Sequence, residues 1–242
     1  MHCSFLEIFR TMKSMNRLTN ADQTTVLEEI ANKSDAHPFR ILISTILSQR
    51  TKDENTRKAS NRLFSHYPDV ESLAKGDPKH VEKLIRVSGF YHVKARSVVA
   101  VAKKISRNYG GDVPNEIDKL LELPLVGRKT ANCVLAYGFR IPAIPVDTHV
   151  HRIANRLSIV ETKSAEETEL ELRERIERKF WLELNEEFVI FGQRICRSVR
   201  PRCLICELKK CCSWYRSHRR VGDVLWSKEK KYDGKIRPRC SD

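Results

Sequence analysis

Apolar residues recur along this chain at spacings of three and four, which is the period of an amphipathic α-helix. Residues 38–50 are strongly apolar and begin with a proline at a first-turn position, which predicts a buried helix. The pattern also predicts helices over 22–32, capped by Thr19, and over 52–65, 70–74, 78–87, 93–108, 116–122, 128–139, 147–157, 166–179 and 185–194. Strand-like alternation is scarce, and turn residues separate the helical ranges. The predicted fold class is all-α.

Length and composition narrow the class of protein. The 242 residues suffice for one large or two small domains, and 40% hydrophobic and 31% charged residues suit a soluble globular protein. No run of 18 uncharged apolar residues occurs, so no membrane span is expected. Glu7 and Arg10 interrupt the first apolar stretch, which excludes a signal peptide. Residues 1–15 are interpreted as a dispensable N-terminal extension, with Met12 and Met15 as alternative starts.

The positive charge is unevenly distributed. The net charge is +14, and residues 37–141 carry 19 Lys and Arg against 10 Asp and Glu. Residues 142–215 carry 13 against 12, and the tail over 216–242 carries 9 against 4. A concentration of cations in the middle of the chain is what a phosphate-binding surface needs. Nucleic-acid binding is therefore favoured, although many basic chains are simply soluble.

Two apolar helices joined by a tight turn form the first informative motif. In residues 117–139 one helix ends at Leu123, Pro124 stops it and Gly127 permits the turn into the next. Such a helix–hairpin–helix directs backbone N–H groups at an anion, which suits a DNA phosphate. The alternative is an ordinary turn between helices. Lys129 stands in the first turn of the second helix, where the macrodipole disfavours an ammonium.

A lysine in that position is expected to have a lowered pKa, and its neutral amine can form a Schiff base. The alternative is a solvated surface lysine. Asp147 follows about 18 residues later, at an N-cap position. It is either a capping residue alone or a carboxylate held at a helix start and aimed back at the hairpin.

The segments LPLVGRKTA and VDTHVHR resemble the helix–hairpin–helix and Gly/Pro-Asp signature of the endonuclease III family, and the resemblance runs from about residue 20 to 215. It implies that Lys129 and Asp147 are the catalytic residues. Lys129 would attack C1′ of a nucleotide whose damaged base is rotated out of the duplex, and β-elimination would then break the strand. The family hairpin usually has glycine where this chain has Leu125, and a side chain there resists positive φ.

The resemblance also indicates which residues contact DNA. Phe90 matches the position of an apolar wedge, for which a buried turn anchor is the alternative. Arg50 aligns with the family's gap-filling glutamine, with Gln49 directly before it. Further expected contacts are Val126, Gly127, Arg128, Thr130, His149, Arg200 and Arg202.

Four cysteines, Cys196, Cys203, Cys206 and Cys212, have the spacing C-x6-C-x2-C-x5-C. Thiolate ligands from one compact loop suit an iron–sulfur cluster. Zinc is the main alternative and disulfides are another. The family resemblance implies a [4Fe–4S] cluster, and Cys211 has a spacing that lets it replace Cys212. Cys133 lies in an apolar helix and is interpreted as a core residue.

The resemblance implies two helical domains with a DNA-binding cleft between them. A helical barrel would span 37–141, and a cluster domain would combine 16–36 with 142–215, followed by a basic tail over 216–242. The predicted function is base-excision repair by a bifunctional glycosylase and lyase that removes oxidised pyrimidines. A mismatch-specific or monofunctional glycosylase and a non-catalytic DNA-binding module are the alternatives. The expected partner is double-stranded DNA with damaged bases or abasic sites. A cytoplasmic monomer is expected, associated with the nucleoid in a prokaryote.

Overall fold

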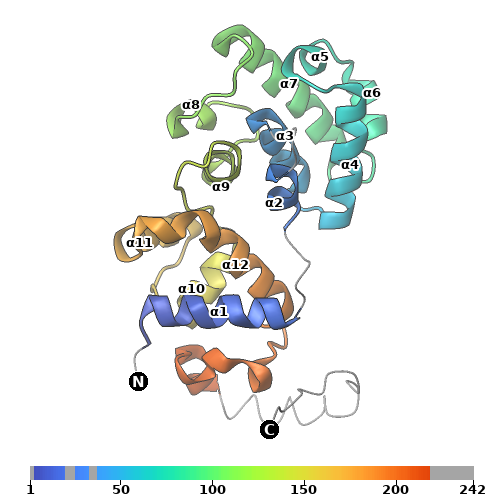
Figure 1. The fold of residues 1–242 in the computed structure, drawn as a ribbon. Helices are drawn as coiled ribbons and strands as arrows, with labels where there is room; N and C mark the ends of the chain where they lie inside the picture. Colours follow the sequence, from blue (N-terminus) through green and yellow to red (C-terminus); the bar gives the residue numbers. More distant parts are fainter. Residues whose placement is uncertain (1–2, 20–24, 33–36, 219–242) are drawn as a thin grey trace.

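The computed structural model describes residues 3–19, 25–32 and 37–218, and within these ranges it contains no strand. The expected all-α class is therefore confirmed (Figure 1). The helices are α1 (Phe5–Thr19), α2 (Val26–Ala31), α3 (Pro38–Ser48), α4 (Asp53–His66), α5 (Val70–Ala74), α6 (Pro78–Leu84), α7 (Tyr91–Tyr109), α8 (Ile117–Leu121), α9 (Arg128–Cys133), α10 (Thr148–Arg156), α11 (Ala165–Arg175) and α12 (Trp181–Arg194).

Short helical segments complete the chain. A π-helical turn, η1 (Val134–Gly138), continues α9 directly, and three 3₁₀ turns follow later: η2 (Arg178–Phe180), η3 (Cys203–Ile205) and η4 (Glu207–Lys210). Residues 213–218 form a last helical turn, where a basic tail was predicted from residue 216. The rest of that tail lies outside the described residues. No helix in the described part of the chain is long and apolar enough to cross a membrane.

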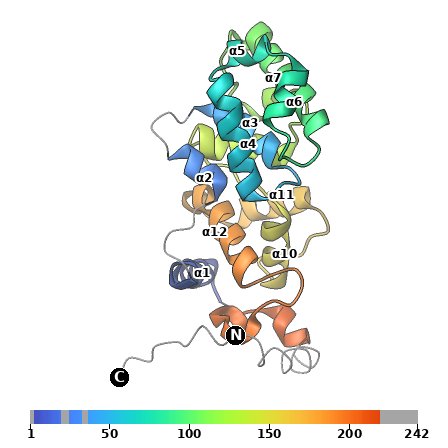
Figure 2. The same ribbon diagram turned by 90° about the vertical axis from the view of Figure 1, so that its right-hand side faces the viewer.

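The molecule has two helical bodies, each with its own hydrophobic core (Figures 1 and 2). The first core is built from α2 to α9 and η1, and its buried members extend from Leu27 to Ala143. The second is built from α1 and α10 to α12 with the cysteine loop, and its buried members after the crossover begin at Ile144. The chain therefore passes between the bodies beside the predicted active-site aspartate.

The interpretation of residues 1–15 as a dispensable extension is wrong. α1 packs against α12, and Ile8, Phe9, Met12 and Met15 are at most 5% exposed within the second core. These apolar residues follow the three- and four-residue spacing of one helix face, so the sequence did contain the signal. A start at Met12 or Met15 would remove part of this core.

The start of the second helix also differs from the prediction. Thr19 is the last residue of α1, and Thr25 caps α2 by accepting a hydrogen bond from Glu28 N at 3.3 Å. α2 belongs to the first core through Leu27, whereas residues 16–36 were expected in the second body. The chain changes bodies between α1, which packs against α12, and α2, which packs against α3.

Polar contacts join the two bodies in addition to apolar packing. The Tyr137 hydroxyl donates to Asn185 Oδ1 at 2.9 Å, and Asn185 Nδ2 donates to the carbonyl of Pro145 at 2.8 Å. Both Tyr137 and Asn185 are buried, at 3% and 4% exposed, so these bonds are shielded from water. The junction is thereby held in one arrangement around the crossover segment.

Candidate active site

The hairpin between α8 and α9 forms, but with a different residue at its tightest point. Leu125 has φ of 58°, whereas Gly127 has an extended φ of −95°. Leu123 and Val126 are buried, at 2% and 6% exposed, and Leu125 between them is 41% exposed. Burial of both neighbours turns Leu125 outward into the left-handed region, where a side chain is strained. The expectation that Gly127 provides the turn is therefore wrong.

Gly127 acts instead as the N-cap of α9. It offers no side chain to accept hydrogen bonds from the first-turn N–H groups, and an added Cβ would meet nothing within 4 Å. Uncapped N–H groups beside open space suit a phosphate oxygen. Val126, in contrast, is a core residue, and its N–H already donates to Leu123 O at 3.1 Å. Thr130 is also buried, so the DNA contacts predicted at these two positions would have to be made by backbone atoms.

Lys129 lies at the junction of the bodies, in the first turn of α9 and partly buried. Burial lowers its pKa, but the neighbouring Cys133 and the carboxylates of Asp147 and Asp53 raise it, and the net shift of the Lys129 pKa is upward. The expectation of a lowered pKa is wrong, because it considered the helix dipole without Cys133 and these carboxylates. Burial raises the pKa of the Cys133 thiol, and its side chain is fully buried, as expected for a core residue.

Asp147 caps α10 as predicted. Its Oδ1 accepts hydrogen bonds from His149 N at 2.8 Å and from Val150 N at 2.9 Å. These two bonds engage one carboxylate oxygen, so the second is not committed to the cap. The carboxylate also interacts electrostatically with Lys129. The structure thus brings together the two residues that the sequence singled out, one from each body.

His149 packs closely against α12. A Cβ added at Gly192 would lie 2.3 Å from the His149 ring, so glycine is required for this approach. Burial lowers the pKa of His149, while the Asp147 carboxylate opposes that shift. Arg152 Nη2 lies 3.1 Å from His149 Nδ1 and donates to Cys196 O at 2.8 Å. The predicted DNA contact His149 is therefore linked to the cysteine loop.

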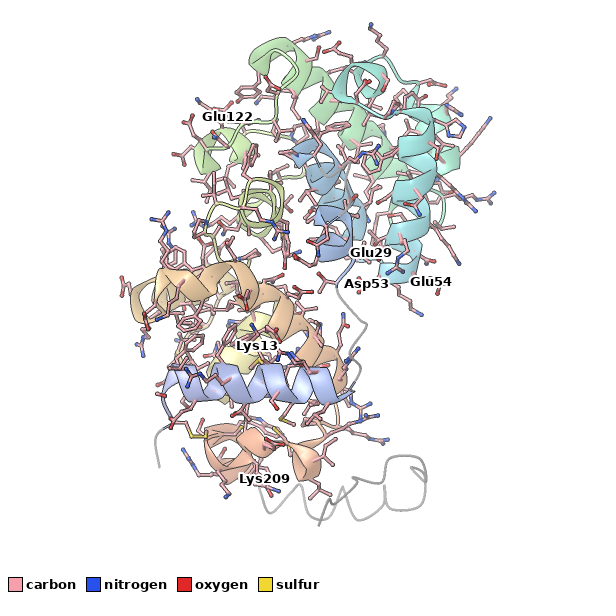
Figure 3. All side chains as sticks on the ribbon, viewed as in Figure 1. Lys13, Glu29, Asp53, Glu54, Glu122 and Lys209 are labelled. Atoms are coloured by element: carbon pink, nitrogen blue, oxygen red, sulfur yellow. A yellow bond between two sulfur atoms is a disulfide. The ribbon has the colours of Figure 1, made fainter. Side chains whose placement is uncertain are left out.

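Asp53 is the residue that sequence reasoning missed. It was not singled out from the sequence, yet it interacts electrostatically with both Lys129 and His149. It begins α4 at the end of the first body that faces the second (Figure 3). Gln193 Nε2 donates to its Oδ2 at 3.5 Å across the junction. No local pattern marks Asp53, because its importance arises from the approach of α4 to the crossover.

Arg128 joins the bodies. Its Nη2 and Nε donate to the two oxygens of Glu169 at 2.7 and 3.0 Å, and Glu169 on α11 is only 2% exposed. The bidentate pair raises the pKa of Arg128, mainly through the side-chain hydrogen bond. Arg128 was predicted to contact DNA, but in this structure its guanidinium is committed to a buried carboxylate.

Loss of this pair is expected to weaken the whole fold. Arg128→Met leaves Glu169 with Arg173 at 3.6 Å and should lower the free energy of unfolding by about 1.5–3 kcal/mol, the usual contribution of hydrogen bonds to a charged group. Urea denaturation measures this loss. The control is Arg175→Met, which removes an exposed ion pair with Glu171 on α11, the helix of Glu169. It should lower the free energy of unfolding by less than about 1 kcal/mol. Equal losses in the two variants would contradict a bridging role.

Gln49, Arg50 and Phe90 come from two loops that touch. Phe90 is 61% exposed with φ of 58°, and Arg50 is exposed with φ of 51°. The Arg50 guanidinium lies 5.4 Å from the centre of the Phe90 ring. Gln49 Nε2 donates to the carbonyl of Leu125 at 3.1 Å, which connects both loops to the hairpin. Phe90 is therefore not the buried turn anchor considered above.

The cysteine loop brings four thiols around one cavity. Cys196, Cys203, Cys206 and Cys212 line it with side chains that include Arg156, Phe191 and Trp214. Burial raises the pKa of both Cys203 and Cys206 to about 12. Within residues 3–19, 25–32 and 37–218, no three His, Cys, Asp or Glu side chains are placed to hold one metal ion.

Cys211 forms a disulfide with Cys3, at the start of the segment that leads into α1. It is therefore not available to replace Cys212 in the loop. This bond ties residues separated by 208 positions and fixes α1 to the cysteine loop, which agrees with the burial of α1 in the second core. The sequence offered no pattern for it, since Cys3 lies in a segment interpreted as dispensable.

Arg200 and Arg202 lie in the loop between the first two cysteines. Arg200 is exposed with φ of 51°, and its carbonyl accepts a hydrogen bond from Arg197 at 3.1 Å. Arg202 is partly buried, and its N–H donates to Ile195 O at 2.9 Å. Arg200 is thus the more accessible of the two cations to a phosphate.

Comparison with known proteins relates this geometry to established families. Residues 43–178 match the family model described as "HhH-GPD superfamily base excision DNA repair protein". The chain is 49% identical over 193 residues to endonuclease III of Thermotoga maritima, covering 80% of this chain and 90% of that protein. A solved trapped endonuclease III–DNA covalent intermediate is similar, with a TM-score of 0.72, 32% identity and coverage of 80% of this chain and 95% of the other.

A thermostable thymine-DNA glycosylase has a TM-score of 0.75 at 24% identity, covering 87% of this chain and 95% of the other. That likeness concerns the fold alone.

Proposed function

Since this chain belongs to the HhH-GPD superfamily of base excision DNA repair proteins, we propose that it is a DNA glycosylase and AP lyase of the endonuclease III type in which Lys129 is the nucleophile. The observation that carries the proposal is the approach of Asp147 to Lys129 at the junction of the two bodies, near enough for the carboxylate to favour the ammonium. A DNA-binding module without catalysis would use these two residues only for structure, and the trapping experiment below separates the two cases.

The reaction begins with a proton and a rotated nucleotide. The damaged base leaves the stack, because its glycosidic bond is inaccessible inside the duplex. The Lys129 ammonium first gives up its proton. The carboxylates that interact with it, Asp147 and Asp53, are the proposed proton acceptors. The amine then forms a bond to C1′ while the C1′–N bond breaks, and the base departs with that electron pair and takes up a proton. Asp147 stabilises the positive charge that develops on the sugar.

Strand cleavage follows from the covalent adduct. The adduct nitrogen loses a proton, and its lone pair forms a C=N bond while the C1′–O4′ bond breaks and O4′ takes up a proton. The resulting protonated Schiff base acidifies the C2′ hydrogen. When that proton is removed, the electron pair of the C2′–H bond forms a C2′–C3′ double bond. The C3′–O bond breaks, and the 3′ phosphate leaves with its electron pair. No oxidant or reductant is consumed. Oxidised pyrimidines are the proposed lesions, as the family resemblance implies, and a panel of duplexes with one defined lesion each tests that assignment.

The hairpin and the two touching loops are proposed to hold the duplex. The first-turn N–H groups of α9, preceded by Gly127, would donate hydrogen bonds to a phosphate oxygen, and Arg200 would bind a second phosphate. Phe90 would wedge into the stack at the site of the rotated base, with Gln49 and Arg50 beside it. Lys129 and Asp147 would then face the exposed sugar.

The four loop cysteines are proposed to hold a [4Fe–4S] cluster, which the endonuclease III family carries. They line one shared cavity, and thiolate ligands from one compact loop suit such a cluster, with zinc as the alternative that metal analysis tests. Their buried thiols have raised pKa values, so metal binding would be needed to hold them as thiolates. Bound there, the cluster would fix the loop that carries Arg200.

Metal analysis tests the cluster. Protein purified without oxygen should be brown and contain roughly four irons per chain, with no stoichiometric zinc. Cys206→Ala should lose the colour and bind DNA weakly, because the loop is released. Cys133→Ala is the control, since this buried thiol lies on α9 in the other body. The iron content of that variant should be unchanged. A colourless protein with one zinc per chain would refute the assignment.

Borohydride trapping tests the catalytic proposal. The protein should become covalently attached to duplex DNA that carries an abasic site when borohydride is present, because the reagent reduces a Schiff base to a stable amine. A protein that removes bases but cannot be trapped would be a monofunctional glycosylase, and the lyase assignment would then fail.

A further inference from the structure

Lys94 is a buried lysine whose ammonium is held by neutral oxygen atoms in the described part of the chain. Lys94, on α7, is 2% exposed, and burial lowers its pKa to about 8. Its Nζ donates to the carbonyls of Leu47 and Gln49 at 2.7 and 2.5 Å, and to the hydroxyls of Thr51 and Ser88 at 2.9 and 3.0 Å. A buried ammonium is costly, so its retention calls for a structural or functional reason.

The acceptors of Lys94 belong to the two loops that carry Arg50 and Phe90. Leu47, Gln49 and Thr51 lie at the end of α3 and in the turn to α4, whereas Ser88 lies in the turn before α7. The Lys94 side chain therefore joins both loops to α7 through hydrogen bonds. Its three N–H donors are shared among four oxygens, which leaves the ammonium fully occupied.

Other contacts show how closely the loops fit. Gly89 N donates to Thr51 Oγ1 at 3.0 Å, and a Cβ added at Gly89 would lie only 2.5 Å from the carbonyl oxygen of Arg50. Ser88 Oγ also donates to Leu47 O at 3.0 Å. A change in either loop must therefore be transmitted to the other.

The residues displayed by these loops are strained as well as exposed. Arg50 and Phe90 both have positive φ, at 51° and 58°, which a non-glycine residue maintains only when its surroundings impose it. An exposed aromatic in a strained backbone gains little for folding. The polar contacts around Lys94 are the surroundings that impose this geometry.

We propose that Lys94 is a positioning residue for base extrusion, holding the loops 49–51 and 88–90 so that Phe90 and Arg50 enter the duplex as a rigid pair. The inference rests on the proposed function of these loops. A wedge that is already ordered avoids the entropic cost of ordering during base rotation. Without Lys94 the loops would relax separately, and the rotated state of the nucleotide would lose support. Chemistry at an existing abasic site needs no extrusion and would be spared.

The full-length variant Lys94→Met tests this role, with duplexes that carry one oxidised pyrimidine beside a 2-aminopurine whose fluorescence reports unstacking. We expect single-turnover base release and the fluorescence change to fall about 10- to 100-fold, the range expected when a stacking contact is lost. Cleavage of a preformed abasic site should change less than about threefold. Lys104→Met is the matched control: it is on the same helix and donates to Glu122 O at 2.8 Å, away from the Asp53 end (Figure 3).

A double-mutant cycle separates positioning from general stability. If Lys94 acts through Phe90, then Lys94→Met should have little further effect on base release in a Phe90→Ala background. Additive losses would overturn the inference. If Lys94→Met does not fold, Thr51→Val replaces it as the test, because it removes one acceptor of Lys94 and leaves the other three. This variant should slow base release but not the cleavage of an abasic site.

The outcomes distinguish this inference from the proposed function. Loss of base release in Phe90→Ala together with normal release in Lys94→Met would overturn the positioning role alone. Equal losses of base release and abasic-site cleavage in Lys94→Met would also overturn it, because they indicate general damage to the fold. Absence of trapping in the unmodified protein would instead refute the proposed function.

Discussion

Lys129→Gln is expected to abolish borohydride trapping on abasic DNA and to reduce strand cleavage to the background rate. The substitution removes the amine while keeping a polar side chain of similar length in the first turn of α9. Without the amine no Schiff base forms, so neither the reduced adduct nor β-elimination follows. DNA binding should fall only slightly, because the backbone groups of the hairpin are unchanged.

Gel analysis of trapped complexes and a binding titration at fixed salt measure the two properties separately. Lys119→Gln is the control, since Lys119 lies on α8 of the same hairpin and pairs with Glu116 on the surface. That variant should be trapped as efficiently as the unmodified protein. Undiminished trapping of Lys129→Gln would place the nucleophile elsewhere and remove the basis of the mechanism.

The pH dependence of trapping follows from the raised pKa of Lys129. The amine attacks only when it is unprotonated, and below its pKa the neutral fraction increases about tenfold for each unit of pH. A pKa above the ordinary value moves this dependence to higher pH, so trapping by the unmodified protein should accelerate continuously as the pH rises from neutral. A rate that is flat across this range would mean that a different step, or a pre-lowered pKa, governs the reaction.

The sequence predicted those parts of the molecule that depend on local patterns. Asp147 was assigned as an N-cap because its position before an apolar helix is a local signal, and the structure confirms the cap. Exposure of Phe90 agrees with the wedge position that the family resemblance implied and not with the buried anchor that was its alternative. The α-helical class was predictable for the same reason, since periodicity is a property of each segment.

What the sequence did not reveal depends on segments that meet only in three dimensions. The pKa of Lys129 was predicted in the wrong direction, because the expectation left out Cys133 one turn along α9 and the carboxylates of Asp147 and Asp53, which approach from other helices. Glu169 engages Arg128 from the other body, so a cation expected on the surface became a bridge. The role of Lys94 is of the same kind, since its four acceptors lie in loops that no local pattern relates.

One error had a different origin. α1 carries a regular apolar stripe, but its position at the start of the chain and the two methionines Met12 and Met15 led to its interpretation as an extension. Its burial against α12 shows that the periodicity deserved more weight than the position. Leu125 gives a second case, in which a residue unsuited to positive φ adopts it because Leu123 and Val126 are both buried.

Asp147→Asn separates the capping role of this residue from its electrostatic role. Asparagine is as good an N-cap as aspartate, so the hydrogen bonds to His149 N and Val150 N can persist and the free energy of unfolding should change little. The negative charge is lost, however, and with it the stabilisation of positive charge on the sugar. Base release should slow by about 10²–10³, as is typical when one electrostatic group of an active site is removed.

Asp147→Asn should slow base release, but it should also make Lys129 easier to deprotonate. Asp147 favours the ammonium, so its neutralisation should lower the pKa of Lys129 and move the rise of abasic-site trapping to lower pH. Asp77→Asn is the control, because Asp77 caps α6 by accepting from Lys79 N at 3.1 Å and has no part in the site. Single-turnover base release, trapping across a pH series and thermal unfolding together decide the matter. If Asp147→Asn loses stability but releases bases at the normal rate, Asp147 is a structural cap alone, and the carboxylate that assists Lys129 must be sought at Asp53.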